Sequence, residues 1–126
     1  MIEIAAILAC VILAGLAIFQ ALLIAGFPFG RFAWGGAHNV LPNKLRIGSA
    51  ISIILYMIIA AIILETSGLI SLISSNSLTG IAIWILAGYF LIGVFMNAIS
   101  KNKSERMMMT PVAFLLSILC VVVALQ

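Results

Sequence analysis

The sequence predicts an all-α protein, a bundle of four transmembrane helices, and three observations support this fold class. Of the 126 residues, 66% are hydrophobic and only 7% are charged, whereas soluble domains carry about 25% charged residues. The mean hydropathy is +1.40, and a chain of this composition has too few polar groups to cover a water-exposed surface. Four uncharged apolar runs also follow one another along the chain, and helices satisfy their own backbone groups in lipid. We expect a single integral membrane domain over residues 1–126, with helices at residues 4–27, 47–64, 81–99 and 107–125.

The first run, IAAILACVILAGLAIFQALLIAGF, is predicted to be a membrane span and not a cleavable signal peptide. No basic residue precedes it, Glu3 stands where a positive charge is expected, and the apolar stretch exceeds a signal-peptide core. Like the other three runs, it reaches about 27 Å or more at about 1.5 Å per residue, which is enough to cross the hydrocarbon core.

The later runs have recognisable start signals. Pro42 or Asn43 can begin the second helix, where Lys44 and Arg46 follow. Before the fourth run, Asn102 and Glu105 have capping-box spacing, and Thr110-Pro111 offers a second start. These signals place basic residues near the N-termini of the second and fourth helices.

The orientation follows from the basic residues, because short connections rich in Lys and Arg stay in the cytoplasm. All six lie in the connections between the first and second and between the third and fourth runs: Arg31, Lys44, Arg46, Lys101, Lys103 and Arg106. The connection between the second and third runs has none, and it carries Glu65. We therefore expect the first and third connections to be cytoplasmic and both termini to lie outside.

The first connection contains an unusual polar stretch, FGRFAWGGAHNVLPNKLR, at residues 29–46. Gly35 and Gly36 can adopt positive φ and turn successive N–H groups toward one point, as in an anion-binding nest. His38 can donate a hydrogen bond when protonated, and Arg46 adds a planar donor fork at the start of the second helix. We expect these residues to form the cytoplasmic lid of an anion-binding site. In the alternative interpretation, the glycines form only a turn and the basic residues only set the topology.

Two amides inside the spans, Gln20 and Asn97, are costly to bury in lipid. Both lie in the half of the bundle that adjoins the first and third connections, as do Ser49 and Ser52. The amides either join neighbouring helices by hydrogen bonds or line a polar pocket that opens to the cytoplasm.

Several short motifs resemble a family of small, uncharacterised prokaryotic proteins with four membrane spans. The matching residues are Phe19-Gln20, Gly26/Pro28/Gly30, Trp34-Gly35-Gly36 with His38, Leu41-Pro42 with Leu45-Arg46, and the Lys101-to-Arg106 segment. The resemblance covers about half of the chain and implies a multi-pass protein of a prokaryotic inner membrane. It brings no assigned function with it, but it does imply that residues 29–46 form a motif.

The predicted function is the binding or transport of an anionic amphiphile or small anion through the cytoplasm-facing pocket. Its ligand would contact Gln20, Gly35, Gly36, His38, Arg46 and Asn97. Membrane lipids, including anionic headgroups, are the expected partners, and no nucleic acid, cofactor or metal is expected, since His38 has no Cys, Asp or Glu nearby in sequence.

Two alternatives remain. The chain can be an accessory subunit of a larger membrane complex or a homo-oligomer, since Gly15, Gly26, Gly88 and Gly93 would permit close helix contacts. It can also be a membrane-embedded enzyme that uses His38 as acid or base with Glu105 nearby. This last alternative is the weaker one, because one histidine and one acid are few groups for catalysis, and no catalytic residue is assigned.

Overall fold

The computed structural model describes residues 2–33, 38–70, 76–99 and 103–125 of the chain. These residues form the four helices α1 (Ile2–Ile24), α2 (Asn43–Ser67), α3 (Asn76–Ala98) and α4 (Lys103–Ala124), and one short 3-10 helix, η1 (Gly30–Phe32). All four long helices are long and apolar enough to cross a membrane. The predicted all-α fold with four membrane-spanning helices is confirmed.

The helix ends differ from the predicted ones by one to five residues. The three helices after α1 begin at Asn43, Asn76 and Lys103, earlier than the apolar runs do. An apolar run marks the part of a helix that lipid would surround, and the helix itself continues into polar residues on either side. The ends of the apolar runs are therefore not the ends of the helices.

Glycines end α1 and α2 through the same backbone motif. Gly26 and Gly68 have φ of 96° and 86°, a left-handed conformation that costs glycine no steric penalty. The residue after each one donates its N–H to a carbonyl five residues earlier, from Phe27 to Leu22 and from Leu69 to Leu64, both at 3.1 Å. This is the Schellman pattern, and it stops α1 at Ile24, three residues before the predicted end.

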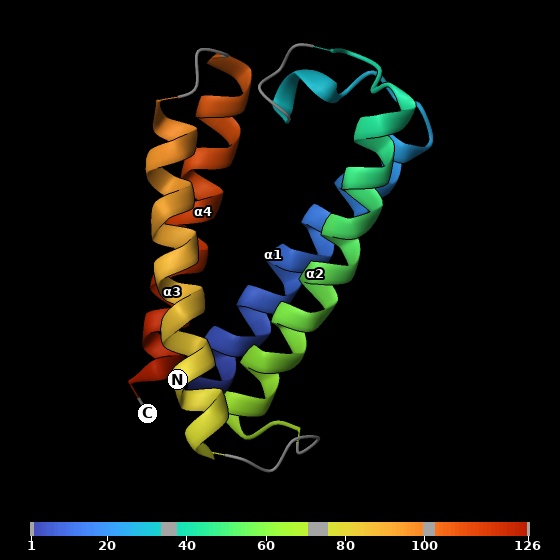
Figure 1. The fold of residues 1–126 in the computed structure, drawn as a ribbon. Helices are drawn as coiled ribbons and strands as arrows, with labels where there is room; N and C mark the ends of the chain where they lie inside the picture. Colours follow the sequence, from blue (N-terminus) through green and yellow to red (C-terminus); the bar gives the residue numbers. More distant parts are fainter. Residues whose placement is uncertain (1, 34–37, 71–75, 100–102, 126) are drawn as a thin grey trace.

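The helices form two hairpins, α1 with α2 and α3 with α4 (Figure 1). The hairpins converge at the end where α1 begins and α4 ends, and they diverge toward the end where η1 lies. Contacts between the hairpins come mainly from α1 with α4 and, to a lesser extent, from α2 with α3. We call the converging part the packed half and the diverging part the open half.

The buried core occupies the packed half. Its members come from all four helices and are mainly small or branched: Ala5, Ala6, Ala9, Leu13, Ile59, Ile63, Ile83, Ala87, Phe90, Leu116, Leu119, Cys120 and Val123. Small side chains allow helix backbones to approach closely, which is the main source of packing energy when lipid surrounds the helices.

Two hydroxyl groups connect the helices of the packed half. Ser117 Oγ donates to the Ala87 carbonyl of α3 at 3.1 Å. Thr66 Oγ1 lies 3.4 Å from the Thr79 carbonyl, also on α3, and 2.8 Å from the Ile62 carbonyl of its own helix. Both hydroxyl groups are thus satisfied by backbone carbonyls.

The charged residues divide between the two ends of the bundle. Lys44, Arg46, Lys103 and Arg106 belong to the first turns of α2 and α4, at the open half. Glu3 and Glu65 lie at the opposite end, near the start of α1 and the end of α2. The fold thus gathers these basic residues at one end, and the side of the membrane that this end faces stays a prediction.

Candidate functional site

A cavity of about 390 Å³ lies between the two hairpins in the open half. All four helices and the η1 segment contribute to its wall. The lining residues are Leu16, Gln20, Phe32, Ala33, Tyr56, Tyr89, Phe90, Ile92, Gly93, Met96, Asn97, Glu105, Met109, Val112, Ala113 and Leu116. Its volume falls within the range of small-molecule sites, about 300–1,000 Å³.

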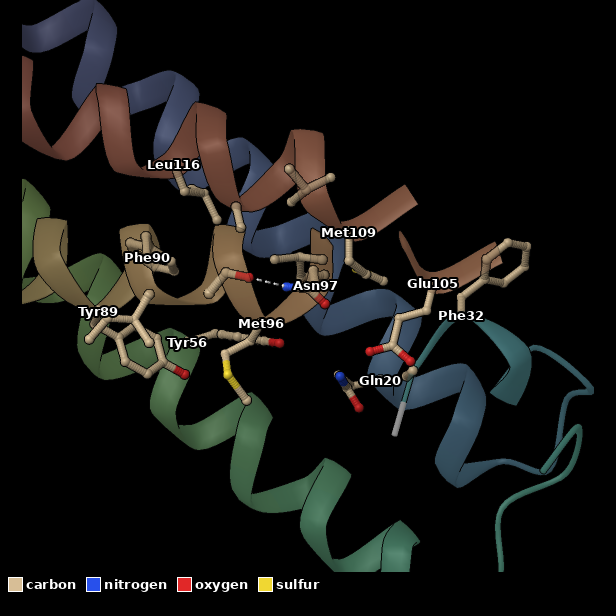
Figure 2. Close-up of a pocket in the computed structure, with 16 residues that line it drawn as sticks. Gln20, Phe32, Tyr56, Tyr89, Phe90, Met96, Asn97, Glu105, Met109 and Leu116 are labelled. Atoms are coloured by element: carbon tan, nitrogen blue, oxygen red, sulfur yellow. Dashed lines mark hydrogen bonds between the residues drawn. The ribbon is translucent and has the colours of Figure 1, made fainter. Parts of the chain in front are cut away.

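The wall combines a large apolar surface with a few polar groups. Every helix provides at least one polar side chain: Gln20 from α1, Tyr56 from α2, Asn97 and Tyr89 from α3, and Glu105 from α4. Figure 2 shows Gln20, Asn97 and Glu105 toward the end of the cavity that Phe32 adjoins, with Phe90 and Leu116 further in. This division suits a molecule with an apolar body and one polar end.

Gln20 is the most deeply buried of these polar residues, with only 7% of its surface exposed. Its amide oxygen Oε1 is buried and has no hydrogen-bond partner among the described residues. This oxygen is an unsatisfied acceptor on a side chain that lines the cavity.

Asn97 is half-buried and is held by its own helix. Its Nδ2 donates to the Gly93 carbonyl at 2.7 Å, the dashed line in Figure 2. Glu105 lies in the first turn of α4, where the helix dipole favours a negative charge. Its half-buried side chain brings a carboxylate to the same part of the wall.

The end of the cavity is covered by η1, which packs against α4. Phe32 and Ala33 supply its lining there. The position of η1 depends on Gly30, whose N–H donates to the Asn39 carbonyl at 2.8 Å. A Cβ at Gly30 would collide with the carbonyl oxygens of His38 and Asn39, so only glycine permits this close approach.

The predicted site residues separate into two groups. Gln20 and Asn97 line the cavity, whereas the described residues His38 and Arg46 are not part of its lining. His38 is exposed. Arg46 Nε donates to the Leu41 carbonyl at 2.8 Å, and its Nη2 lies 3.5 Å from the position that a Cβ on Gly26 would occupy. Arg46 therefore supports the first connection where it enters α2.

The remaining two predicted residues, Gly35 and Gly36, lie outside the described residues, as does the capping residue Asn102. The cavity also includes residues that the sequence did not single out as ligands. Tyr56 carries the clearest signal, a hydroxyl inside an uncharged apolar run. Within the described ranges, no three His, Cys, Asp or Glu side chains come together as metal ligands would.

Comparisons with protein-family models, with curated proteins and with solved structures find no match to this chain. The family resemblance stays a prediction for this reason. The four apolar helices indicate an integral membrane protein.

Proposed function

We propose that this integral membrane protein binds one amphiphile molecule in the cavity between its hairpins. The observation that carries the proposal is the composition of the wall, in which apolar side chains of α1, α3 and α4 surround one cluster of polar groups. An amphiphile would place its apolar body against Leu16, Phe90 and Leu116 and its polar end beside Gln20 and Asn97.

The polar groups supply most of the selectivity in this proposal. An apolar tail gains little by leaving lipid for an apolar cavity, since both environments are hydrocarbon. A polar head group gains more, because the Gln20 oxygen is buried without a partner, and an unsatisfied buried acceptor costs about 1–3 kcal/mol. A ligand that fills this position would recover part of that cost.

The anionic head group predicted from the sequence draws its support from the basic end of the bundle. Lys44, Arg46, Lys103 and Arg106 would raise the local concentration of anionic amphiphiles near the open half. The described lining itself carries a carboxylate, Glu105, and no Lys or Arg. We therefore propose the amphiphile itself as the ligand class, and an anionic head group as one outcome of the tests below.

The proposed orientation places the open half at the cytoplasmic face of a prokaryotic inner membrane, because the basic residues gather there. A cysteine introduced at Lys103 should react with an impermeant reagent only from the cytoplasmic side. Labelling from outside the cell would reverse the proposed orientation and would leave the cavity unchanged.

Two glycines of α3 offer a matched test. Gly93 lines the cavity, and a Cβ there would sit 3.8 Å from Ala113 Cβ, an ordinary contact. Gly88 is exposed on the same helix, and a Cβ there meets no atom within 4 Å. Gly93→Met should fill the cavity, whereas Gly88→Met changes helix propensity by the same amount and leaves the cavity open.

The measurement is native mass spectrometry of protein extracted in a mild detergent. We expect the wild type and Gly88→Met to retain one bound amphiphile, and Gly93→Met to lose it. Equal retention by all three would contradict the proposal. Release of the wild type as part of a larger assembly, without a bound amphiphile, would favour the accessory-subunit alternative.

The enzyme alternative receives less support from the geometry. Glu105 lines the cavity, but His38 does not. The two groups that the alternative requires are therefore not brought together at the cavity.

A further inference from the structure

We propose that the cavity selects an amphiphile whose polar end donates a hydrogen bond, as a hydroxyl or an amine does, to the Gln20 amide oxygen. This inference rests on the proposed function and specifies the chemical class of its ligand. It starts from the Gln20 amide oxygen, a buried atom of a lining residue that has no hydrogen-bond partner among the described residues.

The Gln20 side chain offers an acceptor, its amide oxygen Oε1, which is buried and has no hydrogen-bond partner among the described residues. Figure 2 shows the Gln20 amide at the cavity, on the α1 side. The terminal torsion of glutamine is broad and roughly two-fold, so rotation of the amide can turn Oε1 toward a bound head group.

The other polar groups of the lining favour the same class of ligand. Asn97 already uses its Nδ2 to donate to the Gly93 carbonyl. Glu105 contributes a carboxylate, which accepts hydrogen bonds when ionised and does not donate them. Tyr56 and Tyr89 carry hydroxyl groups, which can both donate and accept. The polar end of the cavity is thus richer in acceptors than in donors.

An anionic head group without a hydrogen to donate fits this set poorly. It would meet the Gln20 oxygen and the Glu105 carboxylate, both of which carry negative charge density, and it would leave Oε1 unsatisfied. The two groups that the sequence predicted would balance its charge, His38 and Arg46, are not part of the lining. A hydroxyl or an ammonium group satisfies Oε1 directly.

Four probes that share a chain of twelve carbons separate these possibilities: dodecanol, dodecylammonium, dodecanoate and the methyl ether methoxydodecane. Equilibrium binding of each radiolabelled probe would be measured on full-length protein in phosphatidylcholine nanodiscs, with empty nanodiscs subtracted. Dodecanol and the ether have uncharged heads and differ in the donor hydrogen. Dodecylammonium and dodecanoate add the two signs of charge.

We expect dodecanol to bind about threefold to tenfold tighter than the ether, the ratio that one neutral hydrogen bond gives. Dodecylammonium should also bind more tightly than dodecanoate. Gln20→Met keeps an unbranched side chain of similar length and should abolish the preference for dodecanol over the ether. Ser52→Ala removes a hydroxyl that bonds only within α2, and it should retain the preference, which controls for general effects of substitution.

Other outcomes would overturn the inference in distinguishable ways. Equal, saturable binding of dodecanol and the ether by the wild type would reject the donor requirement and keep the amphiphile site. Tightest binding of dodecanoate would reject it in favour of the anionic head group. Retention of the dodecanol preference by Gln20→Met would show that another group selects the ligand. If no probe binds saturably and Gly93→Met retains as much amphiphile as the wild type, the inference and the proposed function fail together.

Discussion

The packed half and the open half are built from the same four helices, yet polar side chains serve different purposes in each. In the packed half, Ser117 and Thr66 bond to backbone carbonyls of α3, so their polar groups are satisfied within the bundle. In the open half, Gln20 retains an unsatisfied oxygen at the wall of a cavity. A bundle that is stabilised at one end can maintain an unsatisfied group at the other.

The size of the side chains along α1 explains why the two halves differ. The buried residues near its start are Ala5, Ala6 and Ala9, which let the neighbouring helices approach closely. Two turns and more beyond them, Leu16 and Gln20 face the space between the hairpins. Larger side chains hold the helices further apart, and the cavity begins beyond the buried alanines of α1.

The largest expected effect comes from truncating the packed half. Ile83 is fully buried, whereas Ile85, two residues further along α3, is 66% exposed. Ile83→Ala should lower the free energy of unfolding by about 2 kcal/mol, the low end of the usual range, because the transfer from water contributes little in lipid. Ile85→Ala should change it by less than about 0.5 kcal/mol. Equal effects in reversible unfolding in detergent would remove the distinction between the core and the lipid-facing surface.

A smaller effect is expected for the hydrogen bond that joins α4 to α3. Ser117→Ala removes the donor to the Ala87 carbonyl and should cost about 1 kcal/mol, as interhelical hydrogen bonds in membranes typically do. Ser52→Ala removes a bond to the Gly48 carbonyl within α2 and should cost less. The same unfolding assay compares the two, and a larger loss for Ser52→Ala would contradict the assignment of Ser117 as a contact between helices.

In the open half, substitution of Gln20 is not expected to lower the free energy of unfolding. Gln20→Leu replaces a buried amide that has an unsatisfied oxygen with an apolar side chain of similar size, a change that is nearly neutral or stabilising. We expect the free energy of unfolding without ligand to stay within about 0.5 kcal/mol of the wild type or to rise. A loss as large as that of Ser117→Ala would show that Gln20 joins helices and does not serve a ligand.

The smallest effect is local and concerns the first connection. Arg46→Gln removes the bond to the Leu41 carbonyl, whereas Lys44→Gln removes the same charge from an exposed position of the same turn. Hydrogen exchange of residues 39–41 should accelerate in Arg46→Gln and stay at the wild-type rate in Lys44→Gln. Equal acceleration in both would mean that charge, and not the hydrogen bond, orders this segment.

The four spans, and the half of the bundle in which two cavity residues lie, could be predicted from the sequence. The spans follow from uncharged apolar runs, and Gln20 and Asn97 were placed in the same half because each lies late in an odd-numbered run. The C-terminal ends of α1 and α2 could also have been predicted, since Gly26 and Gly68 stand where a left-handed cap residue is preferred.

The rest depends on contacts between distant segments. The backbone around His38 is placed by the close approach of Gly30 to residues 38 and 39. The periodicity of the sequence does not predict such a contact between separate segments. The convergence of the hairpins at one end depends on which faces of the helices meet, and helices with apolar residues all around give little indication of this. Glu105 reaches the cavity because α4 begins at Lys103, one turn before the apolar run.

The most direct test of the central claim is photo-crosslinking with a dodecanol analogue that carries a diazirine near the end of its tail. In phosphatidylcholine nanodiscs, adducts mapped by mass spectrometry should concentrate on cavity residues such as Leu16, Met96 and Met109. An excess of dodecanol should suppress them, and they should be absent from Gly93→Met. Adducts distributed over exposed residues of α3 such as Ile81 and Ile85, unaffected by competition or by Gly93→Met, would contradict a binding site between the hairpins.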